Sequence, residues 1–96
     1  MEFKVSTMPN ISYRKAIKTN GDYVDFEEVM GITFTEDSHY QIQLLNVSLV
    51  MISDEKPTEG GFLIFDNRPF GYTHKGSKLW IKSIENRAIE VNISEG

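Results

Sequence analysis

Short segments in which apolar and polar residues alternate recur along this chain, and that alternation restricts its fold more than any other feature. The clearest example is the C-terminal stretch GSKLWIKSIENRAIEVNIS, residues 76–94. A repeat of two residues is typical of β-strands with one buried face. The intervening SIENR carries turn-forming residues, so the stretch predicts a hairpin. Its expected inward side chains are Leu79, Ile81, Ile89, Val91 and Ile93.

Other strand-like segments follow one another along the chain. Turn-forming residues separate them about every eight to twelve positions, which is the spacing of all-β proteins. The predicted strands cover residues 3–7, 11–17, 32–35, 39–53, 62–65, 78–82 and 89–93. Residues 70–76 are expected to be an irregular aromatic loop or a short strand, and residues 14–18 are also compatible with a helix.

The segment 39–53 is the longest of these and contains two patterns. Its first six residues, HYQIQL, place Tyr40, Ile42 and Leu44 on one face and the other three residues on the opposite face. Asn46 marks a bend. The following VSLVMIS is apolar at both parities, which predicts a central strand buried on both sides.

Two further segments carry turn or helix signals. The pair Asn20-Gly21 tolerates the positive φ angles of a type I′ turn, so residues 11–17 and the segment that follows are expected to form a hairpin. Residues 23–31 fit neither template cleanly and are expected to be a strand or an irregular edge. The alternative for this segment is a single helical turn capped by Gly31.

Length and composition set the fold class. The 96 residues predict a single domain spanning 1–96, and 40% apolar residues with 11% aromatics are enough for a packed core. Seven or eight short antiparallel strands without a long helix predict an all-β fold, an antiparallel β-sandwich of jelly-roll-like type. A small closed barrel is the alternative.

Composition also argues against several function classes. The net charge is −4, whereas nucleic-acid-binding domains are usually basic. The chain has no cysteine, and its two histidines, His39 and His74, lack further ligands at a metal-binding spacing, so no metal or cofactor is expected. No nucleophile or phosphate-binding motif is present, which argues against an enzyme. No apolar run resembles a signal peptide or a membrane span, so no membrane partner is expected.

Aromatic residues suggest a contact surface. In the loop DNRPFGYTHKG, the residues Arg68, Phe70, Tyr72 and His74 share one parity and are of types enriched at interfaces. The single Trp80 stands on the apparently polar face of its strand. The predicted interface residues are therefore Arg68, Phe70, Tyr72 and Trp80. The favoured alternative for Phe70 and Tyr72 is that they close one end of the sandwich.

The C-terminal half, SLVMISDEKPTEGGFLIF followed by KGSKLWIKSIENRAIEVNIS, resembles small β-sandwich structural proteins of tailed-bacteriophage virions. The shared pattern is a Pro-Thr-x-Gly-Gly-like loop, an apolar strand, a Gly-x-x-Leu-Trp strand and a final alternating strand. The matching residues are Pro57, Thr58, Gly60, Gly61, Gly76, Leu79, Trp80, Ala88, Ile89, Val91 and Ile93. In head-decoration, head-fibre and tail-attachment proteins of this kind, the domain forms oligomers and docks on other virion proteins without catalysing a reaction.

This resemblance implies a non-enzymatic virion protein, assembled in the host cytoplasm, that self-associates and docks on capsid or tail components. Closed symmetric homo-oligomers are the common outcome of self-association, and a homotrimer is the arrangement that would suit the three-fold positions of an icosahedral shell. It also implies that a neighbouring subunit or the second sheet covers Trp80. Two rival functions remain open from the residues alone. One is a carbohydrate- or protein-binding module that uses Phe70, Tyr72 and Trp80. The other is an acidic inhibitor of a host nucleic-acid enzyme, acting through the carboxylates of residues 22–28.

Overall fold

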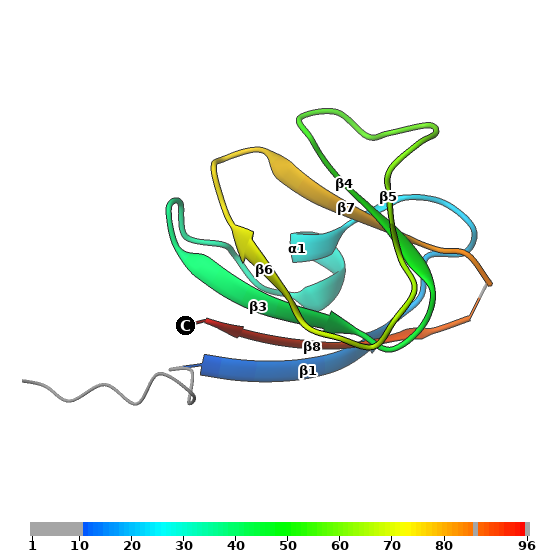
Figure 1. Ribbon diagram of the computed structural model, residues 1–96. Helices are drawn as coiled ribbons and strands as arrows, with labels where there is room; N and C mark the ends of the chain where they lie inside the picture. Colours follow the sequence, from blue (N-terminus) through cyan, green and yellow to red (C-terminus); the bar gives the residue numbers. More distant parts are fainter. Residues whose placement is uncertain (1–10, 86, 96) are drawn as a thin grey trace, which may run out of the picture.

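The computed structural model describes residues 11–85 and 87–95 of the chain (Figure 1). The predicted strand at residues 3–7 lies outside these residues. Within them the chain forms eight strands and one short helix. They are β1 (Ile11–Ile17), β2 (Val24–Asp25), α1 (Phe26–Met30), β3 (His39–Leu44), β4 (Ser48–Ser53), β5 (Phe62–Ile64), β6 (Phe70–Thr73), β7 (Lys78–Ser83) and β8 (Ile89–Glu95).

The strands form two antiparallel sheets of four strands each. The first sheet has the order β1-β8-β3-β6 and the second sheet the order β2-β7-β4-β5. The first strand pairs with the eighth, the second with the seventh, the third with the sixth and the fourth with the fifth. The same four pairings would occur in one long hairpin that has its tip between β4 and β5. Here that hairpin is wound up, so that the first and third pairs lie in one sheet and the second and fourth pairs lie in the other. This winding is a jelly roll, and the predicted all-β sandwich of jelly-roll-like type is confirmed.

The hydrophobic core lies between the two sheets. Leu79 and Ile81 of β7 enter it from the second sheet, and Ile89, Val91 and Ile93 of β8 enter it from the first. Ile81, Ile89 and Val91 have no exposed surface at all. The predicted inward faces of both strands are therefore confirmed.

Two predicted hairpins are wrong, although the turn at Asn20-Gly21 exists. β7 pairs with β2 and β4, whereas β8 pairs with β1 and β3, so the expected C-terminal hairpin is divided between the sheets. At the other turn, Asn20 and Gly21 have the expected positive φ angles of 54° and 81°, and the Asp22 N–H donates to Thr19 O at 3.1 Å. That turn nevertheless connects β1 in the first sheet with β2 in the second. Alternation specifies the buried face of a strand but does not specify its neighbour.

The segment before Gly31 contains a short strand and then one helical turn, the alternative that the sequence left open. The Asp25 carboxylate caps the helix by accepting the Glu27 N–H at 3.1 Å. Gly31 ends the helix at φ 71°, and its N–H donates to Glu27 O at 2.9 Å. The helix buries Phe26 and Met30, which explains why the segment fits no strand pattern.

The predicted strand at residues 32–35 is wrong, because side chains take the place of a neighbouring strand. The Phe34 N–H donates to the Glu27 carboxylate at 2.9 Å, and the Thr35 N–H donates to the Tyr40 hydroxyl at 2.8 Å. These backbone donors are therefore satisfied without a sheet ladder. The buried Phe34 packs on the ring of Tyr40 at a centroid distance of 4.8 Å.

The strands β3 and β4 lie in opposite sheets, on either side of the predicted bend. Tyr40, Ile42 and Leu44 are buried as expected. The Asn46 side chain holds the bend by donating to Ala88 O at 2.6 Å. The expected burial of both faces of β4 is wrong, because β5 pairs only with residues 48–50 and leaves the second half of β4 without a neighbour on that side.

Candidate functional site

The four predicted interface residues do not form one surface. Arg68 is exposed and lies 3.9 Å from the Asp66 carboxylate. Phe70 is half-buried and packs against the core. Tyr72 and Trp80 are buried within the single chain, at 6% and 8% exposure, on different sheets.

Tyr72 and His74 point into the sandwich, next to Phe34. The Tyr72 hydroxyl and His74 Nδ1 are hydrogen-bonded at 2.8 Å, and both residues are buried. Burial raises the pKa of Tyr72 to about 12, with smaller contributions from the charges of Glu27 and Tyr40. The aromatic row of the loop therefore has the predicted common parity but faces inward, and Tyr72 closes one end of the sandwich.

Trp80 lies on the outer face of the second sheet, because its neighbours in β7 face the core. Its indole Nε1 donates to Ser53 O at 2.9 Å. Lys78 Nζ lies 5.8 Å from the centre of the Trp80 ring. The loop at residues 54–61 is held against the start of β2, since the buried Tyr23 hydroxyl donates to Gly60 O and Lys56 Nζ lies 2.7 Å from Asp22. Contacts within the chain thus leave Trp80 little exposed surface. The surface of Phe70, Tyr72 and Trp80 expected for a carbohydrate-binding module is likewise not available.

Most of the carboxylates of residues 22–28 are engaged within the fold. Asp22 accepts hydrogen bonds from Lys56 and from the Tyr23 N–H, which hold its pKa below the usual range. Asp25 caps α1 and lies 3.5 Å from Lys78 Nζ, while Glu27 accepts the Phe34 N–H. These contacts reduce the free negative charge that an acidic inhibitor needs.

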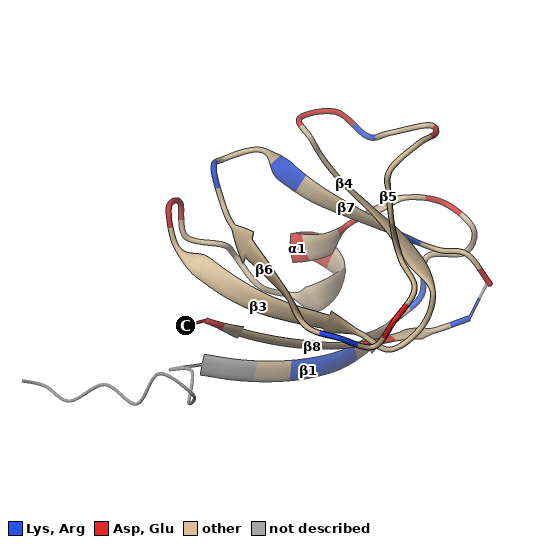
Figure 2. Ribbon diagram, viewed as in Figure 1, with Lys and Arg blue, Asp and Glu red and all other residues tan. Residues whose placement is uncertain are grey.

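A different surface stands out, at the edge strand β5. Four large apolar side chains are exposed there, Phe62 at 75%, Phe65 at 72%, Ile52 at 58% and Leu63 at 54%. We call this group the β5 rim. No charged residue occurs between Glu59 and Asp66, and β5 carries none (Figure 2). The sequence predicts an ordinary strand here, although four consecutive apolar residues without alternation, residues 62–65, also indicate an exposed apolar segment.

An apolar groove adjoins the β5 rim, at the open side of the sandwich between β5 and β6. Its volume is about 380 Å³. The residues that line it from the second sheet include Ile52, Phe62, Ile64 and Leu79. Phe70 lines it from the first sheet. The β5 rim therefore combines projecting phenylalanines with a hollow that has the same apolar chemistry.

Neither a metal-binding cluster nor a helix that could span a membrane occurs in the part of the chain that the structure describes. No group of three or more His, Asp or Glu residues in residues 11–85 and 87–95 is placed to hold a metal ion. In the same residues, no helix has the length and apolarity to cross a membrane. Comparison with known protein families, curated proteins and solved structures finds no match to this chain.

Proposed function

We propose that this protein is a non-enzymatic structural protein of a tailed-phage virion that associates with copies of itself through the β5 rim. The oligomer, a closed dimer or homotrimer, forms in the host cytoplasm and docks on capsid or tail proteins. The exposed β5 rim is the observation that carries the proposal, because a contiguous apolar surface on a small domain usually marks a contact site.

The position of the rim on an edge strand strengthens this inference. Among the described residues, β5 ends the order of the second sheet, so one side of its backbone ladder faces outward. Proteins that remain monomeric usually protect such an edge with charges, prolines or a covering loop. The segment from Gly60 to Phe65 has none of these charges or prolines. The edge is short, at three residues, but it is apolar and carries no charge, which favours pairing with another chain.

The chemistry of the rim favours a second copy of the same chain as that partner. A surface that meets itself brings like charges together, and this one has no charge to repel its copy. It also offers both a projecting Phe65 and an apolar groove lined by Phe70 and Leu79. A phenylalanine of one copy can enter the groove of the next, either as a two-fold pair or around a closed ring.

The size of the rim is appropriate for such a contact. With a full phenylalanine surface of roughly 200 Å², the 75% of Phe62 and 72% of Phe65 that are exposed amount to about 300 Å². Ile52 extends this patch, and Leu63 adds apolar surface on the opposite face of β5. A specific interface buries roughly 800 Å² per partner, so the rim supplies a large part of the apolar centre that one needs.

The assignment to a virion is supported at two levels. Jelly rolls are a recurrent building unit of viral capsids. The turn glycines and the alternating strands of the C-terminal half resemble those of phage decoration and attachment proteins. The fold alone is compatible with many functions, so the virion assignment needs its own test.

Sedimentation equilibrium of the full chain tests the self-association. The wild type is expected at about 22 or 33 kDa, two or three times the 11.0 kDa of one chain. Leu63→Lys places a charge on the exposed edge and should give the monomer. Ile84→Lys is the matched control, since Ile84 is also exposed, at 48%, but lies outside the rim. A wild type that stays monomeric at high micromolar concentration, or two variants that behave alike, would refute association through the rim.

Mass spectrometry of purified particles tests the virion assignment separately. Particles produced in a host that carries the gene are expected to contain the chain in a fixed ratio to the major capsid protein. Particles that lack the chain would exclude a virion role and leave the oligomer to be explained in another way.

A further inference from the structure

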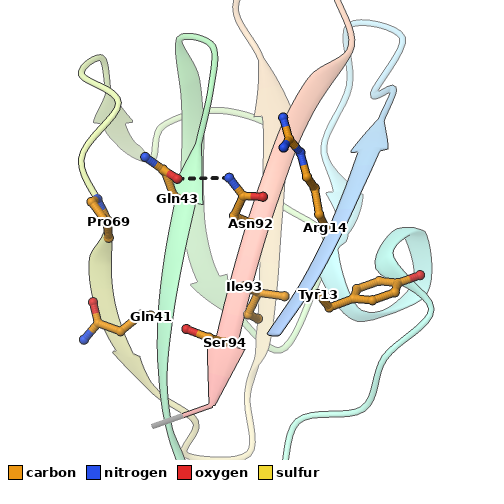
Figure 3. Close-up of a pocket in the computed structure, with 8 residues that line it drawn as sticks. All are labelled: Tyr13, Arg14, Gln41, Gln43, Pro69, Asn92, Ile93 and Ser94. Atoms are coloured by element: carbon orange, nitrogen blue, oxygen red, sulfur yellow. Dashed lines mark hydrogen bonds between the residues drawn. The ribbon is translucent and has the colours of Figure 1, made fainter. Parts of the chain in front are cut away.

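The outer face of the first sheet carries a polar surface that is separate from the β5 rim. Antiparallel register aligns Arg14 of β1, Asn92 of β8 and Gln43 of β3 in one row across the sheet. Ser94 and Gln41 form the next row. Figure 3 shows the side chains of Gln41, Gln43 and Asn92 along these two rows on the same face. We call these five residues the amide face, which contains both glutamines of the chain.

Part of the amide face is held in position by hydrogen bonds. Asn92 Nδ2 donates to Gln43 Oε1 at 3.0 Å, and Gln43 Nε2 donates to Asn67 O at 2.6 Å. These bonds fix the orientation of both amides. Each amide still has a second N–H, and the Asn92 carbonyl oxygen still has acceptor capacity, because a primary amide offers two donors and one oxygen with two lone pairs. The amides of Gln43 and Asn92 are therefore held in an orientation in which they can donate hydrogen bonds to a ligand and accept hydrogen bonds from it.

The charges of this face are balanced. Arg14 Nε donates to Glu90 Oε1 at 2.9 Å, across the neighbouring strands β1 and β8. The other members of the amide face are uncharged. A polyanion or a polycation would find no excess of opposite charge here, so the surface suits a neutral ligand that both donates and accepts hydrogen bonds.

A shallow hollow of about 390 Å³ lies over the amide face. Tyr13 and Arg14 border it at β1, and Pro69 borders it next to β6, so it extends across all four strands (Figure 3). Neighbouring strands lie about 4.8 Å apart, which makes the hollow roughly 14 Å wide. That width suits a chain of several linked units better than one small molecule. The Tyr13 side chain itself lies on the other side of the sheet, because Tyr13 pairs with the core residue Ile93, so polar side chains supply most of the surface of the hollow.

We propose that the amide face binds a neutral polyhydroxylated chain, an oligosaccharide. Sugar hydroxyls donate and accept at once, as the amides of Gln41, Gln43 and Asn92 do. Affinity for one chain is in the millimolar range, because the face is open and solvated. This surface shares no residue with the β5 rim, so the inference does not depend on the proposed self-association.

A titration of the ¹⁵N-labelled full chain, followed by NMR, tests this proposal. The probes are maltohexaose, cellohexaose, xylohexaose and mannohexaose, each to about 10 mM, near the expected dissociation constant. A heparin hexasaccharide and pentaalanine serve as the anionic and peptide probes. At least one neutral hexaose is expected to shift the side-chain NH₂ signals of Gln41, Gln43 and Asn92. Neither the heparin fragment nor the peptide is expected to do so.

Two variants make the test specific. Gln41→Glu keeps the shape of an exposed side chain but removes its N–H donors, and it should weaken binding at least five-fold. Glu28→Gln is the matched control, because it creates an exposed amide on α1, away from this face, and should leave binding unchanged. The proposal is overturned if no neutral hexaose shifts the three amide signals, if the shifts map to another surface, or if only the heparin fragment or the peptide binds.

Discussion

Replacing Val91 by alanine tests the core of the jelly roll most directly. Val91 lies in the middle of β8, which itself lies between β1 and β3, and the residue has no exposed surface. The substitution removes two buried carbons, worth about 1.6 kcal/mol at roughly 0.8 kcal/mol each. A residual void of roughly 30–60 Å³ adds about 1 kcal/mol. The free energy of unfolding should therefore fall by about 2–3 kcal/mol.

Thermal unfolding followed by circular dichroism measures this loss. For a domain of this size, 1 kcal/mol corresponds to a shift of about 4–8 °C in Tm, so Val91→Ala is expected to melt roughly 10–20 °C below the wild type. Val29→Ala removes the same atoms from a half-buried position on α1, where alanine also favours the helix, and should cost less than about 1 kcal/mol. A Val91→Ala protein that melts within about 4 °C of the wild type would show that β8 is not central to the core.

Two further predictions concern the buried hydroxyl at one end of the sandwich and the loop at residues 54–61. Burial raises the pKa of Tyr72 from 10.0 to about 12, so the folded state holds the phenol proton that the unfolded state loses. The free energy of unfolding should therefore decline between about pH 10 and pH 12, and Tyr72→Phe should flatten the decline when urea denaturation is measured across that range. At Gly61, φ is +121° and a Cβ would collide with the Tyr23 hydroxyl, so Gly61→Ala should lower the Tm. Gly76→Ala, with φ +101° and no atom within 4 Å, should lower it less, and equal shifts would refute the steric explanation.

The buried faces of the strands were predictable from the sequence because each depends on local spacing alone. In β3, Tyr40, Ile42 and Leu44 lie inside as their alternation requires. The turn at Asn20-Gly21 was predictable for the same reason, since positive φ angles depend on the residues themselves. Such features need no knowledge of distant parts of the chain.

The partners of the strands were not predictable in this way. The partner of β1 is β8, which lies more than seventy residues along the chain, and the adjacent β2 is in the other sheet. A hairpin and a jelly roll impose the same alternation on each strand. The choice between them is made by the summed packing of two sheets around one core.

The environment of Trp80 shows the same limit on a single residue. Its position between Leu79 and Ile81 correctly indicated the outer face of the sheet. The sequence did not indicate that Ser53 would accept its indole N–H or that the loop at residues 54–61 would be fixed nearby, because these contacts join segments far apart in sequence. The outward position of Trp80 therefore predicted that some other part of a protein covers this side chain. It did not predict whether that part belongs to the same chain or to a neighbouring one.

The β5 rim and the amide face lie on different sheets, and this separation has a consequence for how they would work together. Contact through the β5 edge of the second sheet leaves the outer face of the first sheet open in every copy. On the proposal made above, each open face would bind one sugar chain in the millimolar range. Several faces held in one oligomer raise the apparent affinity for a polymer by about two to four orders of magnitude without any new contact. Weak individual sites are therefore compatible with tight attachment to a polysaccharide surface, provided that the self-association through the β5 rim supplies the required number of copies.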